Sequence, residues 1–188
     1  MKRIGILGDI GSGKSYVARE FGHPVFNADL EVSKLYKKDR KIFHNLNKIL
    51  PKFITKFPID KNEVSKAILD NKHNLKKIVK IVHKKIRKKM NDFLKNNRKR
   101  KIVVLDVPLL LENKLNKKKD ILVFVESKKK DISKKLKKRK NFNQNLLKKF
   151  KIIQLPLDYK KRKSQFVIKN DFKKKSVKKY VKHILDNI

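Results

Sequence analysis

GDIGSGKS, residues 8 to 15, is the stretch of this sequence that decides its fold. In order it reads Gly8, Asp9, Ile10, Gly11, Ser12, Gly13, Lys14 and Ser15. A glycine, four residues and then Gly-Lys-Ser/Thr is the pattern of a phosphate-binding loop. Glycines let the backbone approach phosphate oxygens closely, and successive N–H groups at a helix N-terminus favour an anion. The octapeptide therefore predicts a loop that binds the phosphates of a nucleotide.

Each polar side chain at the end of the loop has an expected task. Lys14 would reach the β- and γ-phosphates of ATP, and the Ser15 hydroxyl would bind Mg²⁺. Tyr16 directly follows the loop, and we expect it to bind ATP together with the loop residues. The sequence therefore predicts ATP and Mg²⁺ as cofactors.

The residues on either side of the loop fit the strand–loop–helix order that the pattern requires. Ile4 to Leu7 is a short apolar run, which is typical of a buried strand. Residues 16–21 predict a helix, because Val17 and Phe21 are four residues apart and so share a face. The alternative is a glycine-rich turn that binds nothing, and this context argues against it.

Length and composition limit the class of protein. The 188 residues suit one domain, residues 1–188, and the absence of cysteine excludes a disulfide framework and a thiolate metal site. No apolar run approaches the roughly 18 residues that a membrane span needs, and the N-terminal run is too short for a signal peptide. We therefore expect a soluble, cytoplasmic protein.

The charge of the chain is strongly positive. Lys and Arg number 55 against 17 Asp and Glu, which gives a formal net charge of +38. Such a charge ordinarily suggests a polyanion partner, but here it is mostly lysine spread along the chain together with much Asn, Ile and Phe. That composition is also what an AT-rich genome encodes, and we favour this interpretation. No specific nucleic-acid partner is expected, although non-specific binding at low salt is.

Apolar runs and helical patterns alternate along the chain. Further strands are predicted at residues 24–26, 121–126 and 166–168, and another at the β-branched start of the apolar run of residues 102–111, where Pro108 should end it. Helical periodicity covers residues 30–48 and about 62–97, and a last helix begins at about Lys174. Strands that alternate with helices indicate an α/β fold with a parallel sheet covered on both faces.

Three acidic residues follow or end predicted strands, where open parallel sheets bind their ligands. Asp29 follows the second strand, Asp106 lies late in the third, and Glu112 comes soon after it. A carboxylate near the γ-phosphate can accept a hydroxyl proton or orient that hydroxyl, and another can hold Mg²⁺ through water. Asp106 is the candidate for the magnesium site, whereas Asp29 could alternatively cap the helix that follows it.

Several motifs outside the loop occur in an order that resembles the dephospho-CoA kinase family. They are Asn27-Ala28-Asp29, His83, Val107 to Asn113, Arg139, Gln154 and Phe166 to Asn170. The resemblance spans nearly the whole chain. Its most specific parts are the stretch from Pro108 to Glu112 and the fifteen-residue gap from Arg139 to Gln154.

The resemblance implies a fold and a reaction. The fold is that of a P-loop kinase, with a five-stranded parallel sheet flanked by helices, a helical substrate-binding region at about residues 60–97 and a lid at about residues 128–150. The implied reaction transfers the γ-phosphoryl group of ATP to the 3′-hydroxyl of the ribose in dephospho-CoA.

The resemblance also implies residue roles. Asp29 would act as base or hydroxyl-orienting group, and Arg139 would be the lid arginine that neutralises charge on the transferred group. With Lys14 these are the catalytic candidates. Residues expected to face the acceptor, besides Asp29, are His83, Arg87, Pro108, Leu109 and Glu112.

The chain departs from the family pattern at a few positions. Asn27 stands where the family usually has Asp, Lys84 follows His83 where Pro is usual, and Leu7 and Asp9 replace the usual Thr and Gly. None of these changes removes a catalytic candidate, so we expect an active enzyme. Two alternatives stay open: another P-loop nucleotide or nucleoside kinase, and a basic nucleic-acid-binding P-loop protein.

Overall fold

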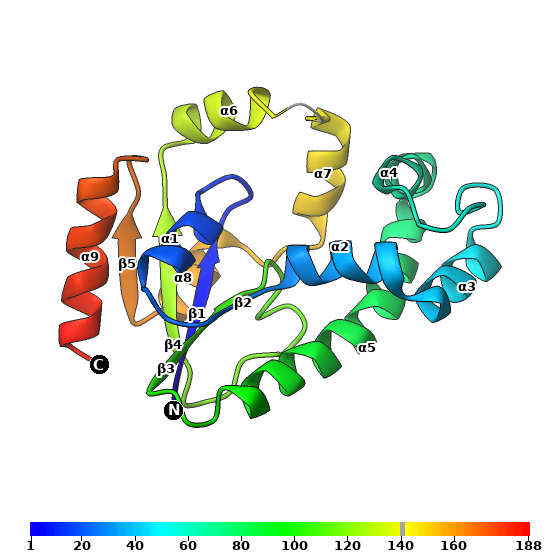
Figure 1. The fold of residues 1–188 in the computed structure, drawn as a ribbon. Coiled ribbons are helices and arrows are strands. Elements are labelled where there is room, and N and C mark those ends of the chain that lie inside the picture. Colours follow the sequence, from blue (N-terminus) through cyan, green and yellow to red (C-terminus); the bar gives the residue numbers. More distant parts are fainter. Residues whose placement is uncertain (140–141) are drawn as a thin grey trace. The chain divides into compact units, whose positions relative to one another are not determined.

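Within residues 1–139 and 142–188, which the computed structural model describes, five parallel strands form one sheet in the order β2-β3-β1-β4-β5 (Figure 1). The strands are β1 (Lys2–Gly8), β2 (Val25–Asn27), β3 (Ile102–Asp106), β4 (Ile121–Glu126) and β5 (Phe166–Lys169). Each predicted strand is present, and the third ends before Pro108, as expected. The α/β fold with a five-stranded parallel sheet is therefore confirmed.

The strand register brings the carboxyl ends of the strands to one edge of the sheet. Gly8 at the end of β1 pairs with Val125 of β4, and Asn27 at the end of β2 pairs with Asp106 of β3. The glycine loop therefore leaves the sheet from the edge at which such sheets bind ligands.

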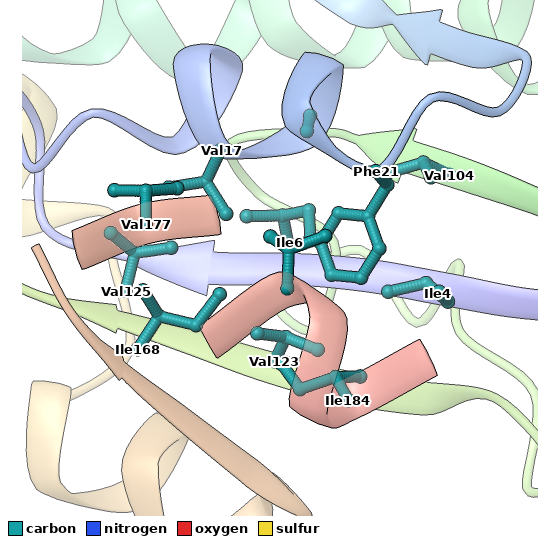
Figure 2. Packing of buried hydrophobic residues seen from close by; sticks show 12 residues of the cluster. Ile4, Ile6, Val17, Phe21, Val104, Val123, Val125, Ile168, Val177 and Ile184 are labelled. Carbon is teal, nitrogen blue, oxygen red and sulfur yellow. The ribbon is translucent and has the colours of Figure 1, made fainter. Parts of the chain in front are cut away.

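One face of the sheet is covered by α1 (Lys14–Glu20) and α9 (Lys174–Asp186). Figure 2 shows their side chains packed against those of the strands. Alternate residues point to one face of a strand, so Ile4 and Ile6 of β1 both reach this core. The fully buried residues that form it include Ile4, Ile6, Val17, Ala18, Val104, Val123, Ile168 and Val177. This packing fixes α1, and with it the end of the loop, on the sheet.

The opposite face of the sheet is contacted by α8 (Leu157–Lys163) and by the segment after β3. The Lys160 side chain of α8 is only 1% exposed, and its Nζ lies 2.6 Å from Oε1 of Glu112, whose side chain is 9% exposed. The backbone N–H of Leu155 donates to the same oxygen at 3.0 Å. A buried ion pair therefore joins α8 to the segment that follows β3.

Breaking this pair should destabilise the protein strongly. Lys160→Met leaves the buried Glu112 carboxylate without its cation, which should lower the free energy of unfolding by about 3–5 kcal/mol. Urea denaturation measures the change. Lys161→Met is the matched control, because Lys161 is paired with Glu126 on the surface and should matter by less than about 1 kcal/mol. Equal losses in the two variants would contradict the buried pair.

The chain divides into two compact units. The sheet and its helices form the unit of Met1–Asn27, Leu94–Phe142 and Gln154–Ile188, and the other unit comprises Ala28–Phe93 and Asn143–Ile153. The helices of this second unit are α2 (Ala28–Lys38), α3 (Arg40–Ile49), α4 (Lys61–Asp70) and α7 (Gln144–Ile152), with most of α5 (Lys72–Asn96). Most of the expected helical region, residues 60–97, lies in it.

The two long helical regions predicted from periodicity are each broken in two. The prediction for residues 30–48 is wrong at Asp39, whose side chain accepts a hydrogen bond from the N–H of Ile42 at 3.0 Å and begins α3 as an N-cap. The region of residues 62–97 is interrupted at Asn71, which accepts from the N–H of His73 at 2.8 Å. Periodicity continues across both breaks because the apolar faces continue, so it cannot reveal them.

The expected lid, residues 128–150, contains α6 (Lys129–Lys137) and most of α7. Residues 140 and 141 of the expected lid lie outside the described residues. Ile132 and Leu136 are the buried residues of α6.

None of the described helices combines the length and the apolar composition that crossing a membrane requires.

Candidate active site

The glycine loop turns sharply between β1 and α1 because three of its residues adopt positive φ. Gly8 has φ 142°, Gly11 has φ 86° and Gly13 has φ 92°, backbone angles that residues other than glycine rarely adopt. Gly13 is the N-cap of α1 and carries no side chain that could cover the helix end. The N-terminus of α1 is therefore open to an anion in the way a phosphate loop requires.

Two residues outside the loop support it, and neither was assigned this role from the sequence, although Asn170 ends one of the motifs. Asn170, which follows β5, donates from Nδ2 to the carbonyl oxygen of Ser12 at 2.8 Å. The Ser127 hydroxyl, just after β4, lies 3.0 Å from that oxygen and 2.9 Å from the carbonyl oxygen of Asn170. A Cβ atom at Gly13 would collide with Nδ2 of Asn170. Glycine at position 13 is therefore required by this support as well as by φ.

The Lys14 side chain lies across the loop. Its Nζ donates to the carbonyl oxygens of Asp9 at 2.7 Å and Gly8 at 3.1 Å. The Asp9 carboxylate accepts a hydrogen bond from the N–H of Ile10 at 2.7 Å, so one of its oxygens is engaged within the loop itself. The departure at position 9 is therefore accommodated by local hydrogen bonding.

Ser15 and Tyr16 lie in the first turn of α1 and are half-buried. Loss of solvent contact, followed by the Glu20 carboxylate, raises the pKa of the Tyr16 hydroxyl. Tyr16 is therefore protonated at neutral pH and can donate a hydrogen bond.

Asp106 and Asn27 form a pair at the ends of neighbouring strands. Nδ2 of Asn27 donates to Oδ2 of Asp106 at 2.6 Å, as their register across β2 and β3 allows. Asp106 is buried, and a buried carboxylate needs such a partner. The Ser15 hydroxyl and the Asp106 carboxylate offer oxygen ligands of the kind that Mg²⁺ prefers, so these residues fit the expected ion.

The acceptor candidates of the sheet unit lie in the segment after β3. Pro108 and Leu109 are half-buried, whereas Glu112 is engaged by Lys160 and by the N–H of Leu155. The structure thus brings Glu112 together with a protein cation that the sequence did not suggest as its partner. Among the described residues, its second oxygen, Oε2, has no hydrogen-bond partner.

Arg139 follows α6 in the same unit. Its backbone N–H donates to the carbonyl oxygen of Leu136 at 3.0 Å, which continues the helical turn by one step. The Arg139 side chain is exposed, and its guanidinium forms no ion pair or hydrogen bond with any described residue. Its charge is therefore available to a ligand.

The remaining candidates belong to the second unit. Asp29 is the second residue of α2 and exposed, and within the described part of the chain its carboxylate has no partner. His83 and Arg87 are four residues apart on α5, which places them on one face of that helix. Because α2 begins at Ala28, Asp29 lies within its first turn, one residue past the helix start.

Sequence comparisons with known proteins point to one family. A family model described as dephospho-CoA kinase matches residues 2–176. A dephospho-CoA kinase of Wolbachia sp. subsp. Brugia malayi is 35% identical over 190 residues, which cover 98% of this chain and 97% of that protein. Another, from Bartonella quintana, is 29% identical over 196 residues, covering 100% and 98%.

Solved structures show the same fold. A crystal structure from Thermus thermophilus superposes with a TM-score of 0.79 at 20% identity, covering 100% of this chain and 97% of that one. A dephospho-CoA kinase from Campylobacter jejuni gives a TM-score of 0.57 at 19% identity, covering 99% and 96%. At these identities the likeness establishes the fold alone.

Proposed function

The chain belongs to the dephospho-CoA kinase family and is an ATP-dependent kinase that acts on a hydroxyl group, and we propose which of its residues bind ATP, which face the acceptor and which act in phosphoryl transfer. The acceptor is the 3′-hydroxyl of the ribose in dephospho-CoA, and the products are coenzyme A and ADP. The observation that most supports this proposal is the glycine loop at the carboxyl end of β1, which is held by the hydrogen bond from Asn170 to the Ser12 carbonyl oxygen.

The loop residues bind the donor. Backbone N–H groups of residues 8–15 surround the phosphates of ATP, and Lys14 Nζ exchanges its carbonyl partners at Gly8 and Asp9 for phosphate oxygens. Because a phosphate oxygen is a charged acceptor, the hydrogen bond of Lys14 is stronger there than to a carbonyl. Ser15 and, through water, Asp106 would hold Mg²⁺, which supplies positive charge next to the phosphates when bound.

Asp29 orients and deprotonates the acceptor hydroxyl. The 3′-oxygen forms its bond to the γ-phosphorus as the bond from that phosphorus to the β–γ bridging oxygen breaks, and ADP leaves with that electron pair. The hydroxyl proton passes to the Asp29 carboxylate. The exposed carboxylate of Asp29 has no competing partner among the described residues, which suits this role.

Arg139 lowers the energy of the transition state. Its guanidinium neutralises the charge that develops on the transferred phosphoryl group. A cation held next to developing charge stabilises the transition state more than the ground state. His83, Arg87, Pro108 and Leu109 contact the acceptor, and Glu112 contributes by holding the segment after β3 in place through Lys160.

An acceptor panel tests the proposal. The wild-type protein with Mg-ATP should release ADP with dephospho-CoA but not with nucleosides or nucleoside monophosphates offered at the same concentration. ADP release is followed by a coupled assay, with Lys14→Ala as the blank. Faster turnover with a nucleoside than with dephospho-CoA would contradict the assigned acceptor and favour a nucleoside kinase.

A further inference from the structure

Helix α6 packs directly on the backbone of the glycine loop. Ile132 and Leu136 are 7% and 5% exposed, and their spacing of four places them on one face of the helix. A Cβ atom at Gly11 would lie 2.9 Å from Cγ of Leu136 and 3.1 Å from Cγ2 of Ile132. These two side chains therefore occupy the space that a side chain at position 11 would need.

Arg139 lies just past the end of α6. It is two residues beyond Lys137, the last residue of the helix, and three beyond the buried Leu136. The hydrogen bond from the Arg139 N–H to the Leu136 carbonyl oxygen, at 3.0 Å, continues the turn beyond the last helical residue. Arg139 is therefore one turn away from the contact with the loop.

A second contact ties α6 to the other side of the loop. Lys135 Nζ lies 5.3 Å from the ring centroid of Phe172, a cation–π distance. The Phe172 ring in turn would be 3.4 Å from a Cβ atom at Gly13. Phe172 has φ 64°. Its backbone N–H donates to Oδ1 of Asn170 at 2.9 Å, and Asn170 is also the residue whose Nδ2 donates to the Ser12 carbonyl oxygen.

We propose that Leu136 and Ile132 are positioning residues that seat α6 on Gly11 and thereby position Arg139, which follows α6, relative to the phosphate loop. This inference rests on the proposed role of Arg139 in phosphoryl transfer. Gly11 is then glycine for two reasons, since φ 86° disfavours a side chain and α6 leaves no room for one. Because misplacing a catalytic group by about 1 Å can cost roughly 100-fold in rate, loosening this contact should affect kcat.

The test is a double-mutant cycle between Leu136 and Arg139. Leu136→Ala should lower kcat by roughly 10- to 100-fold, by displacing Arg139, while the Kd for ATP changes by less than about threefold. In the Arg139→Ala background the same Leu136 substitution should change kcat by less than about twofold, because the group it positions is gone. Leu136→Met, which keeps the volume, should retain most of the wild-type kcat.

Two controls separate positioning from general loss of packing. Leu50→Ala truncates a leucine that is 5% exposed, as Leu136 is, at the C-terminal end of α3, and it should lower the melting temperature without changing kcat in the folded protein. Amide hydrogen exchange of residues 129–138 should be faster in Leu136→Ala than in wild type, a readout that does not depend on activity. If Leu136→Ala fails to fold, Leu136→Val replaces it in the cycle.

Several results would overturn the inference. Equal effects of Leu136→Ala in the two backgrounds would make its role purely structural, and unchanged exchange in α6 would show that Leu136 does not hold the helix on the loop. If the Arg139→Ala enzyme kept the wild-type kcat, Arg139 would have no role in phosphoryl transfer, and the inference would fail while the kinase assignment stayed intact. A wild-type protein inactive on dephospho-CoA would instead overturn the proposed function, and the exchange data alone would then decide whether α6 is seated on the loop.

Discussion

The Gly13→Ala enzyme should lose at least about a thousandfold in kcat/KM, the scale expected when several preorganised donors move from their places. A methyl group at position 13 collides with Nδ2 of Asn170, and the backbone there has φ 92°. Relief of the collision requires Asn170 to move, which breaks its hydrogen bond to the Ser12 carbonyl. Both the loop and the first turn of α1 then shift relative to bound phosphate. Steady-state kinetics and ATP titration calorimetry measure the loss.

Gly22→Ala is the matched control for that substitution. Gly22 also has positive φ, 69°, but a Cβ atom there meets no heavy atom within 4 Å among the described residues. The control therefore carries the backbone strain of an alanine at positive φ, about 1–2 kcal/mol, without the collision. It should be slightly less stable and keep near-wild-type kcat/KM. A similar kinetic loss in both variants would show that strain alone, and not the contact with Asn170, explains glycine at position 13.

The Asp29→Asn enzyme should lose roughly 10²–10⁴-fold in kcat, the range for removal of a general base. The amide is nearly isosteric with the carboxylate but cannot accept the hydroxyl proton. Asp29 is not among the residues proposed to bind ATP, so the Kd for ATP should stay within about threefold of wild type. The loss in rate belongs to the chemical step. Single-turnover kinetics with saturating ATP separate the two quantities.

Glu31→Gln provides the comparison for Asp29→Asn. Glu31 is a half-buried carboxylate in the same first turn of α2, and it is paired with the exposed Lys34. Removing its charge should leave kcat unchanged, since Glu31 has no proposed role in binding or phosphoryl transfer. Equal losses in the two variants would mean that helix-end charge, and not proton transfer, is what Asp29 supplies.

The sequence could predict the sheet and the loop because both depend on local patterns. The apolar run Ile4–Leu7, the loop glycines and the spacing of Val17 and Phe21 are each visible within a few residues. The helix breaks at Asp39 and Asn71 were missed, although both residues are of the types that cap helices. Apolar periodicity continues through each break, and it outweighed the capping signal.

The supports of the site could not be predicted, because they join residues far apart in the chain. Asn170 is 158 residues from Ser12, and no local pattern links a polar residue after the last strand to a carbonyl in the first loop. The pairing of Glu112 with Lys160 was hidden for a related reason. Lys160 is one of many lysines in a chain of charge +38, and nothing in the sequence marks its side chain as buried.

The most direct test of the central claim is the identity of the phosphorylated product. Wild-type protein, Mg-ATP and dephospho-CoA should yield coenzyme A whose new phosphomonoester is on the ribose 3′-oxygen, identified by ³¹P NMR together with mass spectrometry, and one ADP for each coenzyme A. Lys14→Ala, folded by circular dichroism, should form none above background. Absence of coenzyme A with folded wild-type protein, or a phosphoryl group on a different hydroxyl, would contradict the account.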